Sequence, residues 1–414
     1  MPPPILLVNG SDTIEGDTRV FLNAAAELAH GGHRCTFFSA PGAAAEAARG
    51  IAGVDVRIAA GLLAQNADPR RGLRGLVDGV ARAARFSAAV VTIVHEARRQ
   101  RGAIVYTYDR TRGAPAAYLA ARLARRPFVW HANLSIAYNG GRLRRYIAFH
   151  ADRIIAVSRY VAEQYRQAGC PAQALRVVLN GVPAPPNIDA AAGERLRASL
   201  GIAPRAPVIG MVGRLSPWKG QEDLLRATPI LRERFPDLQV LIAGHDTDES
   251  RWTHGPHETS FLAVLERERA RLGLESCVRF LGPVSPPTPV YMAADVVALP
   301  SHEEPFGLVV IEAMLLGRPV VTCRAGGIPE IVAEGTAVLV EPRAPEALAR
   351  ALGDLLADRE GAARVAAAGR SHALARFSRE RFGDDLRAAF AEIAGRYSRA
   401  VGSQDDGRET SARA

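Results

Sequence analysis

The chain has 414 residues, 48% of them hydrophobic, and a formal net charge of +9 at pH 7. This length predicts two or three domains with sizeable cores, and no apolar run approaches the roughly 20 residues of a membrane-spanning helix. The four cysteines are far apart and form no Cys-x-x-Cys pair, which argues against a disulfide framework or a cysteine metal site and favours the cytoplasm.

The N-terminal segment and the first half of the chain show a regular alternation of strand and helix patterns. Pro2 to Pro4 lead directly into an apolar strand, 5–8, so no signal peptide is expected. This strand is followed by a loop through Gly16, a helix that ends at Gly31 and a second strand over 33–38. Together these segments form a strand–helix–strand unit. Further strands are predicted at 103–108, 127–130, 151–158 and 175–179. This alternation predicts a parallel sheet covered by helices.

Basic residues are concentrated in that half. Residues 1–182 carry 24 arginines and 12 acidic residues, whereas the rest of the chain carries 28 basic and 31 acidic residues. A basic half indicates an anionic partner, which could be a membrane surface, a nucleic acid or an acidic ligand. The alternative is that the arginines only form solvated helix faces, and the sequence gives these two interpretations equal weight.

A long helix is predicted over residues 70–101. One face carries Leu76, Val77, Val80, Ala84, Val91 and Val94, and another carries Arg71, Arg74, Arg82 and Arg85. Packing of the apolar face on the sheet is favoured over binding of the arginine face to lipid headgroups.

The segment from 180 to 187 is rich in proline and predicts a hinge. A second domain then starts with a helix over 191–200 and a strand over 207–212. We therefore expect two doubly wound α/β domains, 1–182 and 183–377, facing one another across a cleft at the carboxyl ends of their strands. The polar residues 399–414 predict a disordered tail.

The most informative stretch runs from Ser301 to Met314. It follows an apolar strand, passes through a tight turn with Pro305 and Gly307, and enters a helix. Such a turn directs backbone N–H groups at an anion. Glu304 lies before the helix and Glu312 two turns inside it, so the two carboxylates can bind hydroxyls on either side of a bound phosphate.

Lys219 is the one lysine in the chain, against 51 arginines. It follows Arg214 by five residues, after a predicted strand. Arginine is the basic residue everywhere else in the chain, so a lysine at this position indicates a need for a compact point charge. The alternative is that this lysine has been retained by chance. Arg214 and Lys219 could together neutralise a diphosphate leaving group without a metal.

These motifs resemble the family 4 retaining glycosyltransferases, which have the GT-B fold. The resemblance rests on the Glu304-x7-Glu312 spacing, on the Gly213-Arg214-Leu215…Lys219-Gly220 loop, and on the segments 317–321, 326–330 and 180–182. It implies that Glu304 holds sugar hydroxyls and that Glu312 holds the ribose.

The resemblance implies further site residues. Phe306, Gly307, Leu308 and Val309 would surround the diphosphate, Gly16 would approach it from the first domain, and the backbone of Phe280 and Leu281 would meet the nucleotide base. The resemblance places His131 near the reacting sugar. This role is favoured about two to one over its alternative, a packing role. A helix over 378–398 is expected to pack back on the first domain.

Polar residues after the strands of the first domain are candidates for an acceptor pocket: Tyr108, Asp109, Arg110, Asn133 and Tyr138. The segment 245–257 contains Asp246-x-Asp248 and His254-x-x-His257, for which a metal site has odds of about one in ten.

The expected function is transfer of a sugar from a nucleotide-diphosphate donor to a hydroxyl of a glycan or lipid-linked acceptor, in glycan biosynthesis and with retention. The nucleotide-sugar is the co-substrate, and no obligatory metal or nucleic-acid partner is expected. The alternative is a sugar-nucleotide epimerase or hydrolase of the same fold. A non-catalytic binder is the third hypothesis, and the complete Arg/Lys/Glu/Glu set argues against it.

Overall fold

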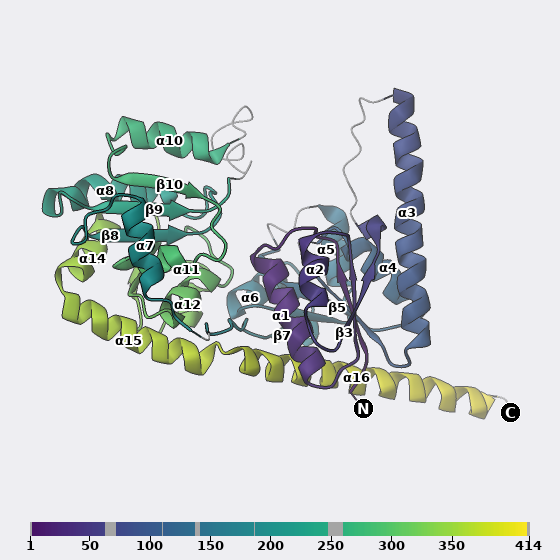
Figure 1. Cartoon of the computed structure of the whole chain (residues 1–414). Coiled ribbons are helices and arrows are strands. Elements are labelled where there is room, and N and C mark those ends of the chain that lie inside the picture. The colour runs from purple at the N-terminus through teal and green to yellow at the C-terminus, as the bar shows by residue number, and fades with distance from the viewer. Residues whose placement is uncertain are drawn as a thin grey trace. The chain divides into compact units, whose positions relative to one another are not determined.

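The computed structural model describes residues 2–62, 72–109, 111–136, 141–185, 187–246 and 260–411, with the side chains of 72–77 and 398–411 excepted. The chain forms two compact units (Figure 1). Unit 1 consists of Met1–Gly181 and Arg379–Ala414, and unit 2 consists of Val182–Ser378.

Unit 1 is built on a sheet of seven parallel strands in the order β3-β2-β1-β4-β5-β6-β7. The strands are β1 (Ile5–Asn9), β2 (Cys35–Ser39), β3 (Val54–Ile58), β4 (Ile104–Tyr108), β5 (Phe128–Ala132), β6 (Arg153–Ala156) and β7 (Leu175–Val177). The helices are α1 (Gly16–His30), α2 (Ala43–Arg49), α3 (Gly72–Arg99), α4 (Ala114–Ala124), α5 (Arg142–Phe149), α6 (Arg159–Gln167) and α16 (Arg379–Ser411), with short 3-10 turns η1 (Ala60–Leu62) and η3 (Ala172–Ala174).

The central strands of unit 1 are buried along their whole length. Parallel strands connected by helices are covered on both faces, so their sequences are continuous apolar runs rather than alternating ones. This explains why short segments such as Ile5 to Val8 could be predicted as strands.

Unit 2 contains a sheet of six parallel strands in the order β10-β9-β8-β11-β12-β13. The strands are β8 (Val208–Val212), β9 (Gln239–Ala243), β10 (Val278–Gly282), β11 (Val296–Leu299), β12 (Val320–Cys323) and β13 (Val338–Val340). The helices are α7 (Ala191–Ser199), α8 (Gln221–Arg234), α10 (Phe261–Arg271), α11 (Thr288–Ala293), α12 (Leu308–Leu315), α13 (Ile328–Ile331), α14 (Pro345–Ala357) and α15 (Arg359–Arg376).

Both sheets reverse their strand order at one point. In unit 1 the reversal lies between β1 and β4, and in unit 2 it lies between β8 and β11. Loops leaving the carboxyl ends of two such neighbouring strands diverge to opposite faces of the sheet and leave a crevice between them. The loop 213–220 and the loop 300–307 are the two loops that leave β8 and β11.

Helix α16 packs against unit 1 along its first half (Figure 1). Phe382, Leu386 and Phe390 are fully buried, and the Arg379 side chain pairs with the largely buried Glu27 of α1. The helix continues to Ser411, and the disordered tail expected at 399–414 stays a prediction. No proline interrupts these residues, and an existing helix extends without the cost of a new nucleus.

The predicted apolar face of the helix over 70–101 was partly wrong. Val80 and Val91 are each 65% exposed, whereas Ile93 and Glu96 are fully buried. Glu96 is tolerated there because Arg57 and Arg99 both pair with it and lower its pKa to about 2 against the effect of burial. A helical wheel that counts only apolar residues cannot find a buried face that contains a paired carboxylate.

Contact of this half with an anionic membrane surface stays a prediction. Arg71 lies outside the described residues, as does the side chain of Arg74, while Arg85 is exposed. In the part of the chain that the structure describes, no helix is both long and apolar enough to cross a bilayer. We expect flotation with anionic vesicles at low salt and loss of binding at high salt, since each basic residue near such a surface adds about 1 kcal/mol. Equal binding to neutral vesicles would contradict the prediction.

Candidate active site

Two loops of unit 2 meet at the carboxyl ends of β8 and β11. The backbone N–H of His302 donates to the Trp218 carbonyl at 2.8 Å, and His302 Nε2 lies 2.7 Å from Asp223 Oδ2. Gly220 adopts a φ of 75°, and a Cβ atom at this position would lie 2.0 Å from the Pro300 carbonyl oxygen. The glycine is therefore required both for its backbone conformation and for the close approach of the two loops.

Lys219 and Glu304 are brought together by this approach. The ammonium Nζ of Lys219 lies 2.5 Å from Glu304 Oε2. The two side chains are only 18% and 10% exposed. Each partner was predicted as a site residue, but the ion pair between them was not, because it joins residues 85 positions apart.

The backbone of Glu304 is fixed by the segment after β12. The Glu304 carbonyl accepts a 2.8 Å hydrogen bond from the N–H of Gly327. Gly326 has a φ of 55°, and a Cβ there would lie 2.2 Å from the same carbonyl oxygen. The Gly326-Gly327 pair thus allows this turn to pass directly over Glu304.

Helix α12 begins beside this ion pair. Its N-cap Gly307 has a φ of 106°, and a Cβ there would clash with Ile328 and Ile331. The N–H groups of Leu308 and Val309, in the first turn, have no acceptor within the helix and are available to an anion. Phe306 differs from the prediction in one respect: its side chain is 3% exposed and packs edge-on against Phe377, so only its backbone can face a ligand.

Glu312 is oriented by a buried tyrosine that sequence reasoning missed. The Tyr291 hydroxyl of α11 donates to Glu312 Oε2 at 2.7 Å, and Tyr291 is 1% exposed. A helix-to-helix hydrogen bond of this kind leaves no signal in residue spacing. It fixes the rotamer of the Glu312 carboxylate.

The carboxyl ends of β8, β9 and β10 are joined through three glycines. Gly213 N–H donates to the Ala243 carbonyl, and Gly244 N–H donates to the Gly282 carbonyl, each at 2.9 Å. A Cβ at Gly244 would lie 1.8 Å from the Gly213 carbonyl oxygen. Phe280 and Leu281 lie on β10, the edge strand, two strands away from β8.

Arg214 lies in the same loop as Lys219, partly buried. Its carbonyl accepts a 2.8 Å hydrogen bond from the Gln221 side-chain amide, which fixes the loop. The structure therefore brings Lys219 and Glu304 into contact and places Arg214 and the start of α12 on the same two loops.

The proposed metal ligands of the 245–257 segment are mostly outside the described residues, including Asp248, His254 and His257. Asp246 is described, and its Oδ1 accepts a 2.8 Å hydrogen bond from the Leu262 N–H in the first turn of α10. Within the described ranges, no group of three His, Cys, Asp or Glu side chains could hold a metal ion.

The switch point of unit 1 carries a separate polar cluster. The Tyr108 hydroxyl donates to Asn9 Oδ1 at 2.8 Å and lies 3.1 Å from Thr18 Oγ1. Gly16 is the first residue of α1 at this edge of the sheet. Asp109 is fully buried and accepts a hydrogen bond from the Leu134 N–H. Arg110 and Tyr138, the other acceptor-pocket candidates, lie outside the described residues.

His131 lies in the interior of unit 1 and not at its surface. Its exposed fraction is 0%, its Nδ1 is hydrogen-bonded to the Tyr106 hydroxyl, and its ring stacks on Tyr106 with a centroid distance of 5.8 Å. Burial lowers the pKa of His131 to about 3. Its Nε2 is buried and has no hydrogen-bond partner among the described residues, and the assignment of His131 to the reacting sugar stays a prediction. Asn133, just beyond the end of β5, has a buried Nδ2 without a hydrogen-bond partner in the described structure.

A buried neutral His131 predicts a specific pH dependence. Its unfolded-state pKa is 6.5 and its folded pKa is lower, so the stability it contributes is complete above pH 6.5 and is lost as the pH falls towards 3. We expect the His131 ring proton resonances to stay constant between about pH 5 and 8. In His131→Gln, which keeps a polar partner for Tyr106, this part of the pH dependence of unfolding should disappear. A ring titration with a midpoint near 6.5 would show that His131 is solvated.

Comparison with known families agrees with this architecture. The model for group 1 glycosyl transferases matches residues 193–372, and the model for a glycosyl transferase 4-like domain matches residues 15–181.

Among curated relatives, the D-inositol 3-phosphate glycosyltransferase of Corynebacterium urealyticum is 44% identical over 194 residues, which are 46% of this chain and 44% of the relative. The protein of the same name from Corynebacterium glutamicum is 43% identical over 174 residues, 41% of this chain and 40% of the relative. The matches thus span less than half the length of these relatives.

Similarity to solved structures extends over nearly the whole chain. Anabaena Alr3699/HepE, solved with UDP and glucose, has a TM-score of 0.75 and 25% identity, covering 94% of this chain and 99% of that one. Sucrose-phosphate synthase from Thermosynechococcus elongatus has a TM-score of 0.66 and 22% identity, covering 94% and 99%. Together with the two family models, this likeness shows that the chain belongs to the family 4, group 1 glycosyltransferases and has the GT-B fold of two Rossmann-like domains.

Proposed function

We propose that this protein is a retaining glycosyltransferase that moves a sugar from a UDP-sugar donor to an acceptor hydroxyl. The observation that carries the proposal is the Lys219–Glu304 pair beside the start of α12. It combines a cation, a sugar-binding carboxylate and unsatisfied backbone N–H groups at one switch point. The structures of HepE with UDP and with UDP-glucose support uridine as the base and glucose as the first sugar to test.

In the proposed reaction the donor diphosphate lies at the N-terminus of α12. Negative charge grows on it as the bond from the sugar C1 to the phosphate oxygen breaks. Lys219 and Arg214 stabilise this charge, and the N–H groups of Leu308 and Val309 add hydrogen bonds. Arg214 and Lys219 supply the cations that a divalent metal would otherwise supply, so no metal is assigned.

Retention of configuration is proposed to arise from attack on the face that the diphosphate leaves. The acceptor oxygen forms the new bond to C1, and its proton passes to the departing phosphate oxygen. A double displacement would need a carboxylate nucleophile, and Glu304 is poorly suited because Lys219 already holds one of its oxygens. Its proposed role is to bind sugar hydroxyls.

The acceptor has two candidate classes. The sequence predicted a glycan or a lipid-linked hydroxyl, whereas the name of the curated relatives points to a phosphorylated polyol, D-inositol 3-phosphate. The two classes differ in solubility and charge, so they can be tested separately with the same donor.

The first test measures UDP release and product from UDP-glucose, with each acceptor class and without acceptor, in excess chelator. We expect acceptor-dependent turnover that the chelator does not abolish. Lys219→Ala should lower kcat by about 10²–10³-fold, the usual loss of one group aimed at developing charge. Lys219→Arg should restore little, because a planar fork is a poor substitute for a point charge.

Arg350→Ala is the matched control, since it removes an exposed cation from α14 of the same unit and should leave kcat unchanged. Donor consumption without acceptor would instead favour an epimerase or hydrolase. If the chelator abolishes activity and Mg²⁺ restores it, the metal-free assignment is wrong. An inverted anomer in the product would overturn retention.

The two glutamates should respond differently to substitution. Glu312→Gln should mainly raise the donor KM, because the ribose assigned to it does not change in the reaction. Glu304→Gln should lower kcat as well. Tyr291→Phe, which removes the hydrogen bond to Glu312 Oε2, should raise the donor KM in the same direction but less. Steady-state kinetics with varied donor measure all three, and identical profiles for the two glutamate variants would refute this division of roles.

A further inference from the structure

His302 makes two contacts that lie on either side of Lys219 in the chain. Its backbone N–H donates to the Trp218 carbonyl at 2.8 Å, and its ring Nε2 lies 2.7 Å from Asp223 Oδ2. Trp218 directly precedes Lys219, and Asp223 lies after it, in the first turn of α8. One residue of the β11 loop therefore holds both ends of the segment that carries Lys219.

The side-chain contact is a partly buried hydrogen bond to a carboxylate. The side chains of His302 and Asp223 are 13% and 7% exposed. Because a carboxylate can only accept, the ring Nε2 carries the proton and donates the hydrogen bond. The partial positive charge at the start of α8 favours a carboxylate at Asp223. Shielding from water makes such a bond stronger than the same contact at the surface.

His302 also lies just before Glu304 in the same loop. The Glu304 backbone is fixed from its other side by the 2.8 Å hydrogen bond from the Gly327 N–H. The distance from Glu304 Oε2 to Lys219 Nζ, 2.5 Å, thus depends on where His302 holds the β11 loop against the β8 loop. Gly220 permits the two backbones to approach, but it has no side chain that could restrain them.

We propose that His302 is a positioning residue, which holds the segment on both sides of Lys219 and so keeps the ammonium group where charge develops on the donor diphosphate. This assignment rests on the proposed function, because His302 acts on the reaction only through Lys219. In the ground state the diphosphate keeps its hydrogen bonds to the N–H groups at the start of α12. Loss of the imidazole should therefore lower kcat more than it raises the donor KM.

Steady-state kinetics of variants on both sides of the contact test the proposal. His302→Phe keeps an aromatic ring and removes the N–H donor, and we expect kcat to fall about ten- to a hundredfold, as small displacements of a catalytic group cause. His302→Gln keeps a side-chain N–H and should restore most of this rate. Asp223→Ala, which removes the acceptor, should reproduce the loss. In each case the donor KM should change by less than kcat.

Combination with Lys219→Ala separates positioning from a general structural role. Once the ammonium group is absent, His302 has nothing to position, so His302→Phe should lower the kcat of the Lys219→Ala enzyme by less than about twofold. If the two losses multiply instead, His302 acts independently of Lys219 and the proposal is wrong. It is equally wrong if His302→Phe turns over at the wild-type rate.

A second measurement needs no turnover. Lys219 is the only lysine in the chain, so full-length protein labelled with isotope-enriched lysine gives a single set of lysine side-chain resonances. We expect these resonances to shift in Glu304→Gln, which removes the anionic partner, and in His302→Phe, but not in His302→Gln. Unchanged resonances in His302→Phe would overturn the positioning role. Absence of wild-type turnover with these shifts present would refute the proposed function and not the placement of Lys219 by His302.

Arg197→Ala is the matched control in unit 2. Arg197 Nη2 donates to Asp295 Oδ2 at 2.8 Å, and the same oxygen accepts from the Val208 N–H. Asp295 directly precedes β11 and Val208 begins β8, so this contact joins the same two strands at the opposite edge of the sheet. Arg197→Ala should lower the melting temperature and leave kcat and the Lys219 resonances unchanged. A loss of kcat as large as in His302→Phe would attribute both losses to destabilisation and overturn the proposal.

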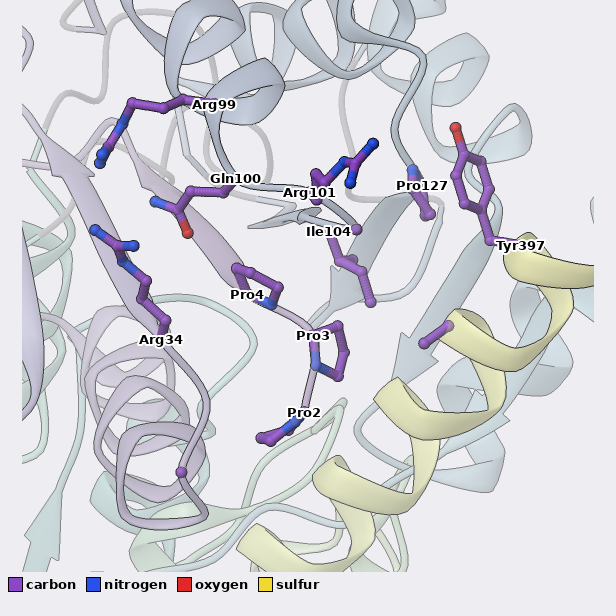
Figure 2. A pocket seen from close by; sticks show the side chains of 13 residues that line it. Pro2, Pro3, Pro4, Arg34, Arg99, Gln100, Arg101, Ile104, Pro127 and Tyr397 are labelled. Carbon is purple, nitrogen blue, oxygen red and sulfur yellow. The ribbon is translucent and has the colours of Figure 1, made fainter. Parts of the chain in front are cut away.

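Tyr397→Phe is the control in unit 1, where it removes the hydrogen bond from the Tyr397 hydroxyl to the Arg125 carbonyl. Tyr397 lines a cavity of about 700 Å³ together with residues at the amino ends of the strands, such as Pro4, Ile104 and Pro127 (Figure 2). None of the described residues that line this cavity belongs to the proposed donor site. Loss of one side-chain hydrogen bond there should leave kcat unchanged. Circular dichroism of each variant establishes that the fold is intact.

Discussion

The contact between the β8 loop and the β11 loop depends on strand order. Residues 219 and 304 are far apart in the chain, and they meet because β11 pairs with β8 and both strands point the same way. The approach is close enough that Gly220 has no space for a Cβ against Pro300. Any change that separates these loops would remove the ion pair, the Trp218–His302 hydrogen bond and the position of the α12 N-terminus together. The proposed chemistry therefore rests on backbone packing before it rests on any single charge.

Partial burial gives the pair its energetic meaning. At the protein surface an ion pair contributes at most about 1 kcal/mol, since water screens it. The side chains of Lys219 and Glu304 are much less exposed than those of a surface ion pair. Removing one partner would therefore leave the other as a charged group with little access to solvent. A bound diphosphate would offer Lys219 a second anionic partner without the loss of the first, because an ammonium group has three donors. The ligand-free pair is thus compatible with a site that is already arranged for its donor.

The sequence predicted local structure better than it predicted contacts. The buried strands, the two glutamates and the Gly307 turn all have short-range signatures, and the strand–helix alternation was enough to predict two parallel sheets. The Tyr291–Glu312 hydrogen bond and the Lys219–Glu304 pair have none, since each depends on which strands become neighbours. The predicted α3 face failed for a related reason. A glutamate in the core is stable when a partner such as Arg99 satisfies it, and that partner cannot be identified from periodicity.

Several arginines of this molecule hold a carboxylate in a way that a lysine cannot. Arg99, Arg166 and Arg271 each engage both oxygens of a glutamate, through Nε and an Nη atom. This fork geometry uses the whole carboxylate. Lys219 engages only Oε2 of Glu304, so Oε1 keeps its capacity to accept a hydrogen bond from a sugar hydroxyl. Under the proposed function, the single lysine in a chain with 51 arginines holds this carboxylate by one oxygen and leaves the other for the ligand.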